Sequence, residues 1–389
     1  MKNWSTRILI LVLLIVAVLS GYNYFHRPFL SRFTQQQPAT EDQEIDSVAV
    51  RLAEMSIEER VAQMISLPVV LGAEAAGAAT ESAVVEQDLA WIAANQPGFV
   101  TLFGSALAAE QVADFSQQLG ELPLTYKPLV AVDHEGGTVQ RLSGGGFTRL
   151  PNWRQVCGML EESRQELLAS SAAELSEAGV QLAFAPVVDV ARPGAYLGNR
   201  ACQDSEIVVA AASDYITSFA QFGVLPVIKH FPGIGSLTTD PHFQLDAVNL
   251  ESQDTTVFEQ LLTSFPNIGV MTTHVVVEGR TDELPCSLSA SCLGRFPVSF
   301  PEAMVFTDAL EMAAASEADG DEELALTEIA VRAVLAGNNV LVFGDQVDLA
   351  TIDEIIGALA VEYQLDENFR SVVDNSVSKI LSVKVPSEQ

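Results

Sequence analysis

Short apolar runs alternate with amphipathic stretches through most of the chain. The runs are rich in Val, Ile, Leu and Phe and end at polar residues, Gly or Pro, which is typical of buried strands. We predict strands over residues 64–71, 99–103, 129–133, 181–190, 225–228, 269–273, 303–306 and 339–343. We predict helices over residues 82–95, 108–119, 161–178, 207–222, 256–264 and 322–335, with further helices at the C-terminal end. Eight strands separated mostly by helices favour a parallel α/β barrel over an open doubly wound sheet.

Polar residues stand where the predicted strands end. In a parallel barrel these positions share one face, because the carboxyl ends of all strands point the same way. The residues at these ends are Asp133, Asp189, Lys229, His230, Thr273, His274, Thr307, Asp308 and Asp345. Carboxylates, imidazoles and a lysine on one face predict a catalytic or binding site.

The most informative stretch covers residues 225–242, LPVIKHFPGIGSLTTDPH. An apolar run ends in Lys229 and His230, a Pro/Gly-rich turn follows, and Asp240 and His242 then flank a proline. Proline disfavours a helix before it, so Asp240 can reach one imidazole nitrogen of His242 and orient the other. His230, Asp240 and His242 also match metal ligands by type. We favour the Asp240–His242 pair and expect no metal ion and no cofactor.

Composition limits the partners. The 389 residues, 48% of them hydrophobic, suit one large α/β barrel, and the net charge of −31 argues against nucleic acid and against electrostatic attachment to anionic lipid. The cysteines allow three disulfide connectivities, or remain free thiols, and they are Cys157, Cys202, Cys286 and Cys292. We expect a monomer.

The N-terminal segment resembles an export signal. Lys2 and Arg7 precede the aliphatic stretch 8–19, and neither a following cysteine nor a clear cleavage site is seen. We therefore predict an uncleaved signal-anchor helix within residues 1–30, a polar tether over 31–46 and the barrel over 47–389. The catalytic domain is then membrane-anchored outside the cytoplasm, at the periplasmic face. Secretion after cleavage of the signal remains the alternative.

Three motifs resemble those of glycoside hydrolase family 3. Residues 132–142, VDHEGGTVQRL, resemble its D-x-E-G-G-x-V-x-R-L segment. Residues 229–242 resemble the K-H-F-P-G-H-G-x-x-x-x-D-S-H signature of its β-N-acetylglucosaminidase branch, and residues 306–312, FTDALEM, resemble F-S-D-D-L-S-M. Weaker similarities include 198–200 and 271–275. The motifs follow the family's order between about residues 48 and 345.

The resemblance implies a (β/α)8 barrel and a retaining mechanism. Asp308 would be the nucleophile, and His242 paired with Asp240 would be the acid/base, where most glycosidases use a second carboxylic acid. The residues expected to hold the sugar are Asp133, Arg141, Arg200, Lys229 and His230. Glu135 is expected to hold the adjacent two-glycine turn, and His274 to support the site from behind.

Three functions fit these residues. The first is an exo-β-N-acetylhexosaminidase that removes N-acetylglucosamine from peptidoglycan fragments or chitooligosaccharides. The others are a non-catalytic sugar-binding barrel and a phosphorylase of the same branch. Three departures from the family motifs bear on the choice: Ile234 replaces a histidine, Pro241 a serine and Ala309 an aspartate.

Overall fold

The computed structural model describes residues 41–72, 81–279, 282–294, 296–317 and 324–384. The predicted signal anchor over residues 1–30 lies outside the described residues. Within the described part of the chain, no helix combines the length and the hydropathy needed to cross a membrane. Helix α3, Glu41–Glu54, begins inside the segment that we assigned to a polar tether, so residues 41–46 are helical.

Eight parallel strands form one sheet, in which strands that follow one another along the chain lie side by side. They are β1 (Ile65–Val70), β2 (Phe99–Phe103), β3 (Leu129–Val132), β6 (Leu182–Ala183), β7 (Leu225–Phe231), β9 (Gly269–Thr272), β11 (Met304–Thr307) and β12 (Leu341–Val342). A parallel bridge between Phe306 and Val340 joins β11 to β12, and the amide of Thr307 donates to the carbonyl of Val340 at 3.0 Å. The sheet therefore curls into a barrel, and the predicted α/β barrel is confirmed.

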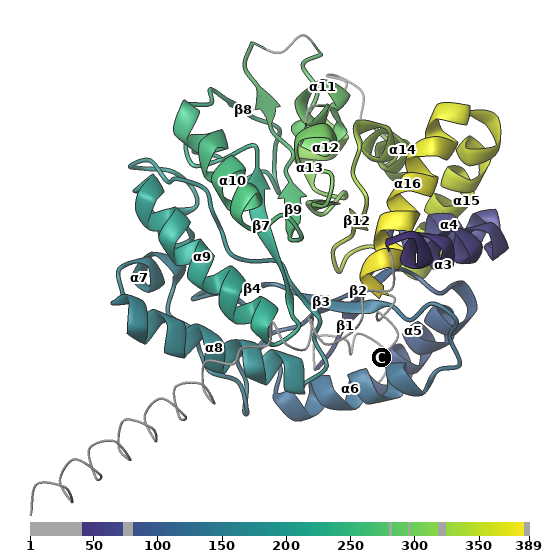
Figure 1. Ribbon diagram of the computed structural model, residues 1–389, viewed down its shortest axis with the longest axis horizontal. Coiled ribbons are helices and arrows are strands. Elements are labelled where there is room, and N and C mark those ends of the chain that lie inside the picture. The colour runs from purple at the N-terminus through teal and green to yellow at the C-terminus, as the bar shows by residue number, and fades with distance from the viewer. Residues whose placement is uncertain (1–40, 73–80, 280–281, 295, 318–323, 385–389) are drawn as a thin grey trace, which may run out of the picture. The chain divides into compact units, whose positions relative to one another are not determined.

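Helices form an outer layer around these strands (Figure 1). They are α4 (Ile57–Gln63), α5 (Glu81–Asn95), α6 (Ala109–Glu121), α7 (Trp153–Cys157), α8 (Glu161–Glu177), α9 (Ser205–Gln221), α10 (Ser252–Ser264), α11 (Ala290–Leu293), α12 (Phe296–Ser299), α13 (Ala313–Ser316), α14 (Leu326–Ala336), α15 (Leu349–Leu365) and α16 (Glu367–Lys384). Short additions decorate the carboxyl ends of the strands: the antiparallel pair β4 (His134–Gly136) and β5 (Val139–Gln140), the parallel pair β8 (Ala247–Val248) and β10 (Val276–Val277), and the 3-10 turns η2 (Gly198–Arg200) and η3 (Cys286–Leu288).

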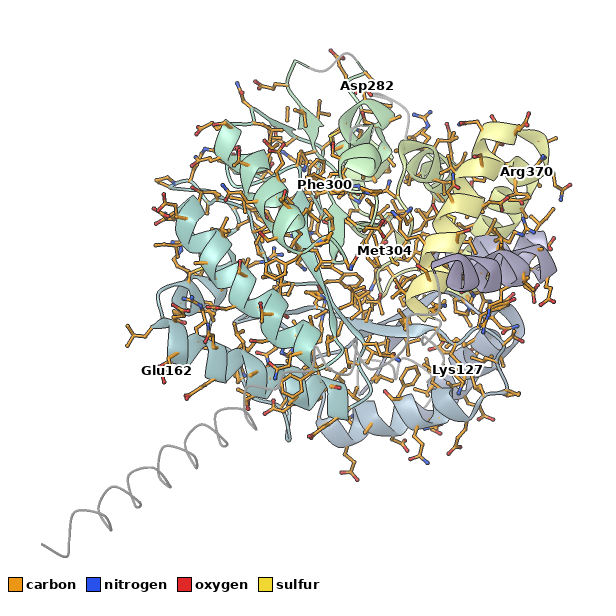
Figure 2. All side chains as sticks on the ribbon, viewed as in Figure 1. Lys127, Glu162, Asp282, Phe300, Met304 and Arg370 are labelled. Atoms are coloured by element: carbon orange, nitrogen blue, oxygen red, sulfur yellow. A yellow bond between two sulfur atoms is a disulfide. The ribbon has the colours of Figure 1, made fainter. Side chains whose placement is uncertain are left out.

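The core follows from the pattern of apolar residues. Inside the barrel, the ring of Phe306 makes edge contacts with Phe99 and Phe184, with centroids 5.5 and 5.8 Å apart. In Figure 2 the side chain of Met304 lies toward the interior, whereas Arg370 lies at the periphery. Burying each such large side chain contributes roughly 1.5–3 kcal/mol. The strands are apolar on both faces because one face lines the barrel and the other meets the helices.

Two predicted strands are much shorter than expected, and one is longer. Of residues 181–190 only Leu182–Ala183 pair as β6, because Pro186 has no N–H to donate to a ladder. Of residues 339–343 only Leu341–Val342 pair as β12. Strand β7 continues to Phe231, so Lys229 and His230 belong to the strand and do not follow it. Both are buried, which the expectation of a strand ending at Ile228 missed.

All four cysteines form disulfides. Cys157 pairs with Cys202 and Cys286 with Cys292. The sequence left the connectivity open, and the structure selects these pairs because the fold brings α7 against the segment before α9, and η3 against α11. The first bridge spans 45 residues and ties two separate segments together.

Candidate active site

A cavity of about 440 Å³ opens at the carboxyl ends of the strands. Seven of the eight residues that the sequence predicted for the site line it: Asp133, Arg141, Arg200, Lys229, His230, His242 and Asp308. The eighth, Asp240, contacts His242. The barrel thus brings together groups that are far apart in the sequence, as the strand-end pattern predicted.

One wall of the cavity is a network of paired charges. Lys229 Nζ lies 2.9 Å from Asp133 Oδ1 and 2.7 Å from Glu135 Oε1. Arg200 binds Glu135 through two parallel contacts of 2.9 Å, from Nε to Oε2 and from Nη2 to Oε1. We expected Glu135 only to hold the adjacent turn. Its carboxylate also binds both cations, Lys229 and Arg200.

The charges in this network shift one another's pKa values. Burial by itself would raise the pKa of Glu135, but the charges of Lys229 and Arg200 outweigh it and lower the pKa to about 2. Burial likewise opposes the charged form of Lys229, yet Asp133 and Glu135 raise its pKa above the usual value. Two cations and two carboxylates therefore line this side of the cavity. Their donors and acceptors that are not used within the network can bind sugar hydroxyls.

Arg141 and Tyr196 complete this side of the cavity. Arg141 lies at its edge: its Nε is 4.0 Å from Asp133 Oδ2, and its guanidinium sits 5.2 Å from the centroid of the Phe103 ring. The hydroxyl of Tyr196 accepts a hydrogen bond of 3.0 Å from Arg200 Nη1. Sequence reasoning missed Tyr196, which no motif marked.

His230 is held from behind by Asp189. Its Nδ1 and its backbone amide contact Asp189 Oδ2 at 2.7 and 3.0 Å, and the amide of Ile234 donates to Asp189 Oδ1 at 2.7 Å. With Nδ1 bound to the carboxylate, Nε2 is the ring nitrogen left for the cavity. Asp189 was marked only as a strand-end residue, and its three contacts show that it orients both His230 and the following turn.

Asp308 lines the cavity and directly follows β11. Its Oδ1 accepts the amide of Ala309 at 3.0 Å, and its Oδ2 accepts the Thr273 hydroxyl at 3.3 Å. Burial alone would raise the pKa of Asp308, but electrostatic interaction with the neighbouring His230, followed by other nearby imidazoles and Lys229, lowers it below the usual value. A buried, ionised carboxylate facing a cavity is chemically suited to attack an electrophilic carbon.

His242 lines the cavity from an irregular loop. Its Nδ1 contacts Asp240 Oδ1 at 2.7 Å, and its backbone amide donates to the same oxygen at 3.0 Å. Pro241 closes this two-residue turn, and its carbonyl accepts the amide of Ala314 at 3.3 Å, which anchors the loop on α13. The predicted Asp240–His242 pair is therefore formed, with Nε2 free to exchange a proton.

His274 supports the site, as the sequence suggested. Its Nε2 donates to the carbonyl of Ala309 at 2.9 Å, so its Nδ1 accepts the Ser287 hydroxyl at 2.6 Å. Burial lowers the pKa of His274, and both ring nitrogens are occupied. Among the described residues, no three His, Cys, Asp or Glu side chains converge as ligands for a metal ion.

Glu311 is a further carboxylate in the cavity, and sequence reasoning did not single it out. It lines the same cavity as Asp308 and Asp345, and its Oε2 is buried without a hydrogen-bond partner among the described residues. Burial, followed by the charges of Asp308 and Asp345, raises the pKa of Glu311. Gly344 makes room for it, because a Cβ there would lie 2.0 Å from Glu311 Oε1. The signal was available: Glu311 stands where the resembling motif has serine.

Comparison with known proteins points to one family. Residues 56–383 match the family model described as the glycosyl hydrolase family 3 N terminal domain. A β-hexosaminidase of Thioalkalivibrio sulfidiphilus is 36% identical over 230 residues, which are 54% of this chain and 65% of that protein. The match thus spans less than two thirds of that relative's length.

Two further relatives match over longer stretches. The β-hexosaminidase LpqI of Mycobacterium tuberculosis is 32% identical over 313 residues, which are 74% of each chain. The crystal structure of a β-N-acetylhexosaminidase from Beutenbergia cavernae superimposes with a TM-score of 0.72 at 26% identity, and the alignment covers 85% of this chain and 99% of that one. The similarity includes the barrel and the strands that carry the cavity.

Proposed function

The chain belongs to glycosyl hydrolase family 3, and we propose that it is a retaining exo-β-N-acetylhexosaminidase. Its relatives named β-hexosaminidase support this activity. One observation carries the proposal: the cavity lined by Asp308 also receives His242, whose imidazole is held by Asp240 at 2.7 Å. A nucleophile and a proton donor at one cavity are the two groups that retaining glycoside hydrolysis needs.

The reaction would proceed in two displacements. In the first, the Asp308 carboxylate attacks the anomeric carbon, the bond from that carbon to the leaving oxygen breaks, and His242 Nε2 gives its proton to that oxygen. In the second, His242 takes a proton from water, the water oxygen bonds to the anomeric carbon, and the carboxylate of Asp308 is released. Asp240 keeps the proton on Nδ1 and stabilises the imidazolium that exists before the first proton transfer and is formed again by the second.

The paired wall would bind the sugar ring. Asp133 accepts hydrogen bonds from sugar hydroxyls, and Lys229, Arg200 and His230 donate them. Because these groups are already held by one another, little conformational entropy is lost when the sugar binds. A terminal N-acetylglucosamine on peptidoglycan fragments or chitooligosaccharides is the substrate that we propose.

We also propose that the catalytic domain works outside the cytoplasm. Two disulfides fit a domain that works in an oxidising compartment, outside the cytoplasm. Together with the basic, then aliphatic, N-terminal segment, they support a catalytic domain that is exported and retained at the membrane.

The test is hydrolysis of nitrophenyl N-acetyl-β-glucosaminide by the full chain, beside the matching β-glucoside and with and without inorganic phosphate. Release of nitrophenol from the N-acetyl substrate, unaffected by phosphate, is the expected result. Acceleration by phosphate with formation of a sugar 1-phosphate would instead favour the phosphorylase, because an imidazole repels phosphate less than a carboxylate does. Binding of N-acetylglucosamine without turnover would leave the non-catalytic barrel.

A further inference from the structure

Helix α7 contacts both segments that supply the Glu135–Arg200 ion pair. On the first side, it begins at Trp153, and the side chain of the preceding residue, Asn152, caps it by accepting the amide of Gln155 at 3.1 Å. The turn between β4 and β5 packs against this cap so closely that a Cβ on Gly137 would lie 2.8 Å from Asn152 Cβ. The amide of Gly137 also donates to the carbonyl of Leu150 at 3.1 Å. The turn next to Glu135 is thereby fixed to the start of α7.

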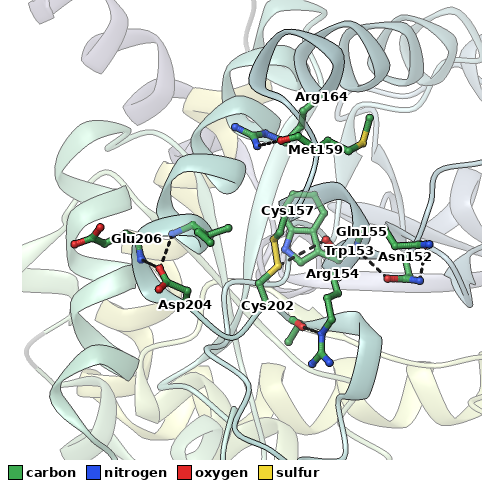
Figure 3. The surroundings of a disulfide bond; sticks show 12 residues. Asn152, Trp153, Arg154, Gln155, Cys157, Met159, Arg164, Cys202, Asp204 and Glu206 are labelled. Carbon is green, nitrogen blue, oxygen red and sulfur yellow. Dashed lines mark hydrogen bonds between the residues drawn. A yellow bond between two sulfur atoms is a disulfide. The ribbon is translucent and has the colours of Figure 1, made fainter.

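On the second side, α7 holds the segment that carries Arg200. Arg154 Nη2 donates to the carbonyl of Gly198 at 2.7 Å, and its Nε donates to the carbonyl of Ala201 at 3.1 Å. These two carbonyls flank Arg200 in the sequence. The disulfide between Cys157 and Cys202 attaches the same segment once more (Figure 3).

The Arg200 segment has little regular structure of its own. Between β6 and α9 it contains only the 3-10 turn η2, three residues long, and isolated bridges to its neighbours. A segment of this kind samples many conformations unless other elements restrain it, and that freedom would be lost at the moment of sugar binding. Arg154 and the disulfide restrain the segment before sugar binds, so this conformational entropy is lost when the protein folds.

We propose that Arg154 and the Cys157–Cys202 disulfide are positioning groups, which act through Arg200 to set the affinity of the site for sugar. They hold the Arg200 segment in register with the β4–β5 turn, so that Arg200 meets Glu135 with both nitrogens at 2.9 Å. The inference rests on the proposed function, in which Arg200 holds the sugar. Neither Arg154 nor the cysteines line the cavity themselves.

The decisive experiment measures kcat and KM for nitrophenyl N-acetyl-β-glucosaminide with Arg154→Ala, Arg200→Lys and the double variant. We expect Arg154→Ala to misplace the Arg200 guanidinium and so to raise KM about 10- to 100-fold, with a much smaller change in kcat. In the Arg200→Lys background the same change adds little, because both substitutions remove one function. Equal effects of Arg154→Ala in both backgrounds would show that Arg154 acts independently of Arg200 and would overturn the inference.

Arg370→Ala is the matched control. Its guanidinium also donates to two backbone carbonyls, those of Tyr363 and Gln364, each at 3.2 Å, but on the remote helices α15 and α16. This variant is expected to keep the KM of the unaltered chain. If Arg154→Ala does not fold, Arg154→Lys and the Cys157→Ser/Cys202→Ser variant replace it, and each should also raise KM.

Calorimetric titration with N-acetylglucosamine distinguishes failure of the proposed hydrolase activity from failure of the proposed positioning role of Arg154. If the unaltered chain binds but does not hydrolyse, the proposed activity is wrong, and affinity replaces KM in the comparison above. If the chain hydrolyses the substrate and Arg154→Ala leaves KM and affinity unchanged, only the positioning role is wrong.

Discussion

Lys229 Nζ lies 2.7 Å from Oε1 of Glu135, a carboxylate whose side chain is 1% exposed. The contact joins strand β7 to strand β4, two segments that the sequence separates widely. A buried ion pair of this kind stabilises the fold only while both partners are present, because each compensates the other's loss of water. Removing one member therefore has consequences for both stability and binding.

Glu135→Gln is expected to lower the free energy of unfolding by about 3 kcal/mol, because it leaves the Lys229 and Arg200 charges without their shared carboxylate. Chemical denaturation measures this, with Glu177→Gln on the exposed end of α8 as the control. The same variant should raise KM. A stability equal to that of the unaltered chain would contradict the role assigned to Glu135.

The stability that Glu135 provides should disappear in acid. Its pKa is lowered from 4.5 to about 2 on folding, so the contribution is complete above pH 4.5 and is lost as the pH falls toward 2. Unfolding curves of the unaltered chain should therefore converge with those of Glu135→Gln over this range. A difference between the two proteins that stays constant down to pH 2 would exclude this linkage.

Asp308→Asn is expected to reduce kcat by at least about 10³-fold while the fold is retained, because the amide cannot form the glycosyl-enzyme bond. Activity on nitrophenyl N-acetyl-β-glucosaminide and circular dichroism measure the two properties. Wild-type-like turnover in this variant would remove Asp308 as the nucleophile.

Asp240→Asn is expected to slow the reaction according to the leaving group. Without the carboxylate that holds Nδ1, His242 becomes a poorer proton donor, and loss of general acid catalysis costs roughly 10²–10⁴-fold. Nitrophenol is a good leaving group and needs little protonation, so kcat/KM for a chitooligosaccharide should fall more than that for the nitrophenyl glycoside. Equal losses on both substrates would argue that Asp240 does not act through His242 in the proton transfer.

Glu311→Gln is expected to leave the acid limb of the kcat/KM profile at the same pH as in the unaltered chain. The pKa of Asp308 is lowered and that of Glu311 is raised, so Asp308 ionises at a pH where Glu311 is still protonated and uncharged. In that range the neutral amide of Gln presents Asp308 with the same charge as Glu311 does. The pH profile of the variant checks this, and an acid limb displaced to lower pH would show that a Glu311 charge opposes ionisation of Asp308.

Much of the site could be predicted because its residues stand at recognisable local positions. Asp133, Lys229, His230 and Asp308 each follow or end an apolar run, and a parallel barrel places all such positions on one face. The Asp240–His242 contact was predictable for a different reason: the two residues are separated only by Pro241, so the contact depends on a single turn.

Contacts between distant segments could not be predicted in the same way. Glu135 resembled a turn residue because its partner Arg200 lies 65 residues later, and only packing decides which carboxylate reaches that guanidinium. The disulfides were open for the same reason, since four cysteines allow three pairings until the fold fixes their distances. Strand β6 was overestimated because Pro186 interrupts a run that is otherwise apolar enough for a strand.

The sequence by itself determined the order of most strands and helices, the face on which the polar strand-end residues gather and the contact between Asp240 and His242. These depend on the period of apolar residues and on local turn chemistry, which act over a few residues. Only the tertiary structure decided that Glu135 joins Lys229 to Arg200, that Asp189 orients His230 and that α7 fixes the Arg200 segment. Such pairings depend on distances and burial set by the closed barrel, which no local pattern encodes.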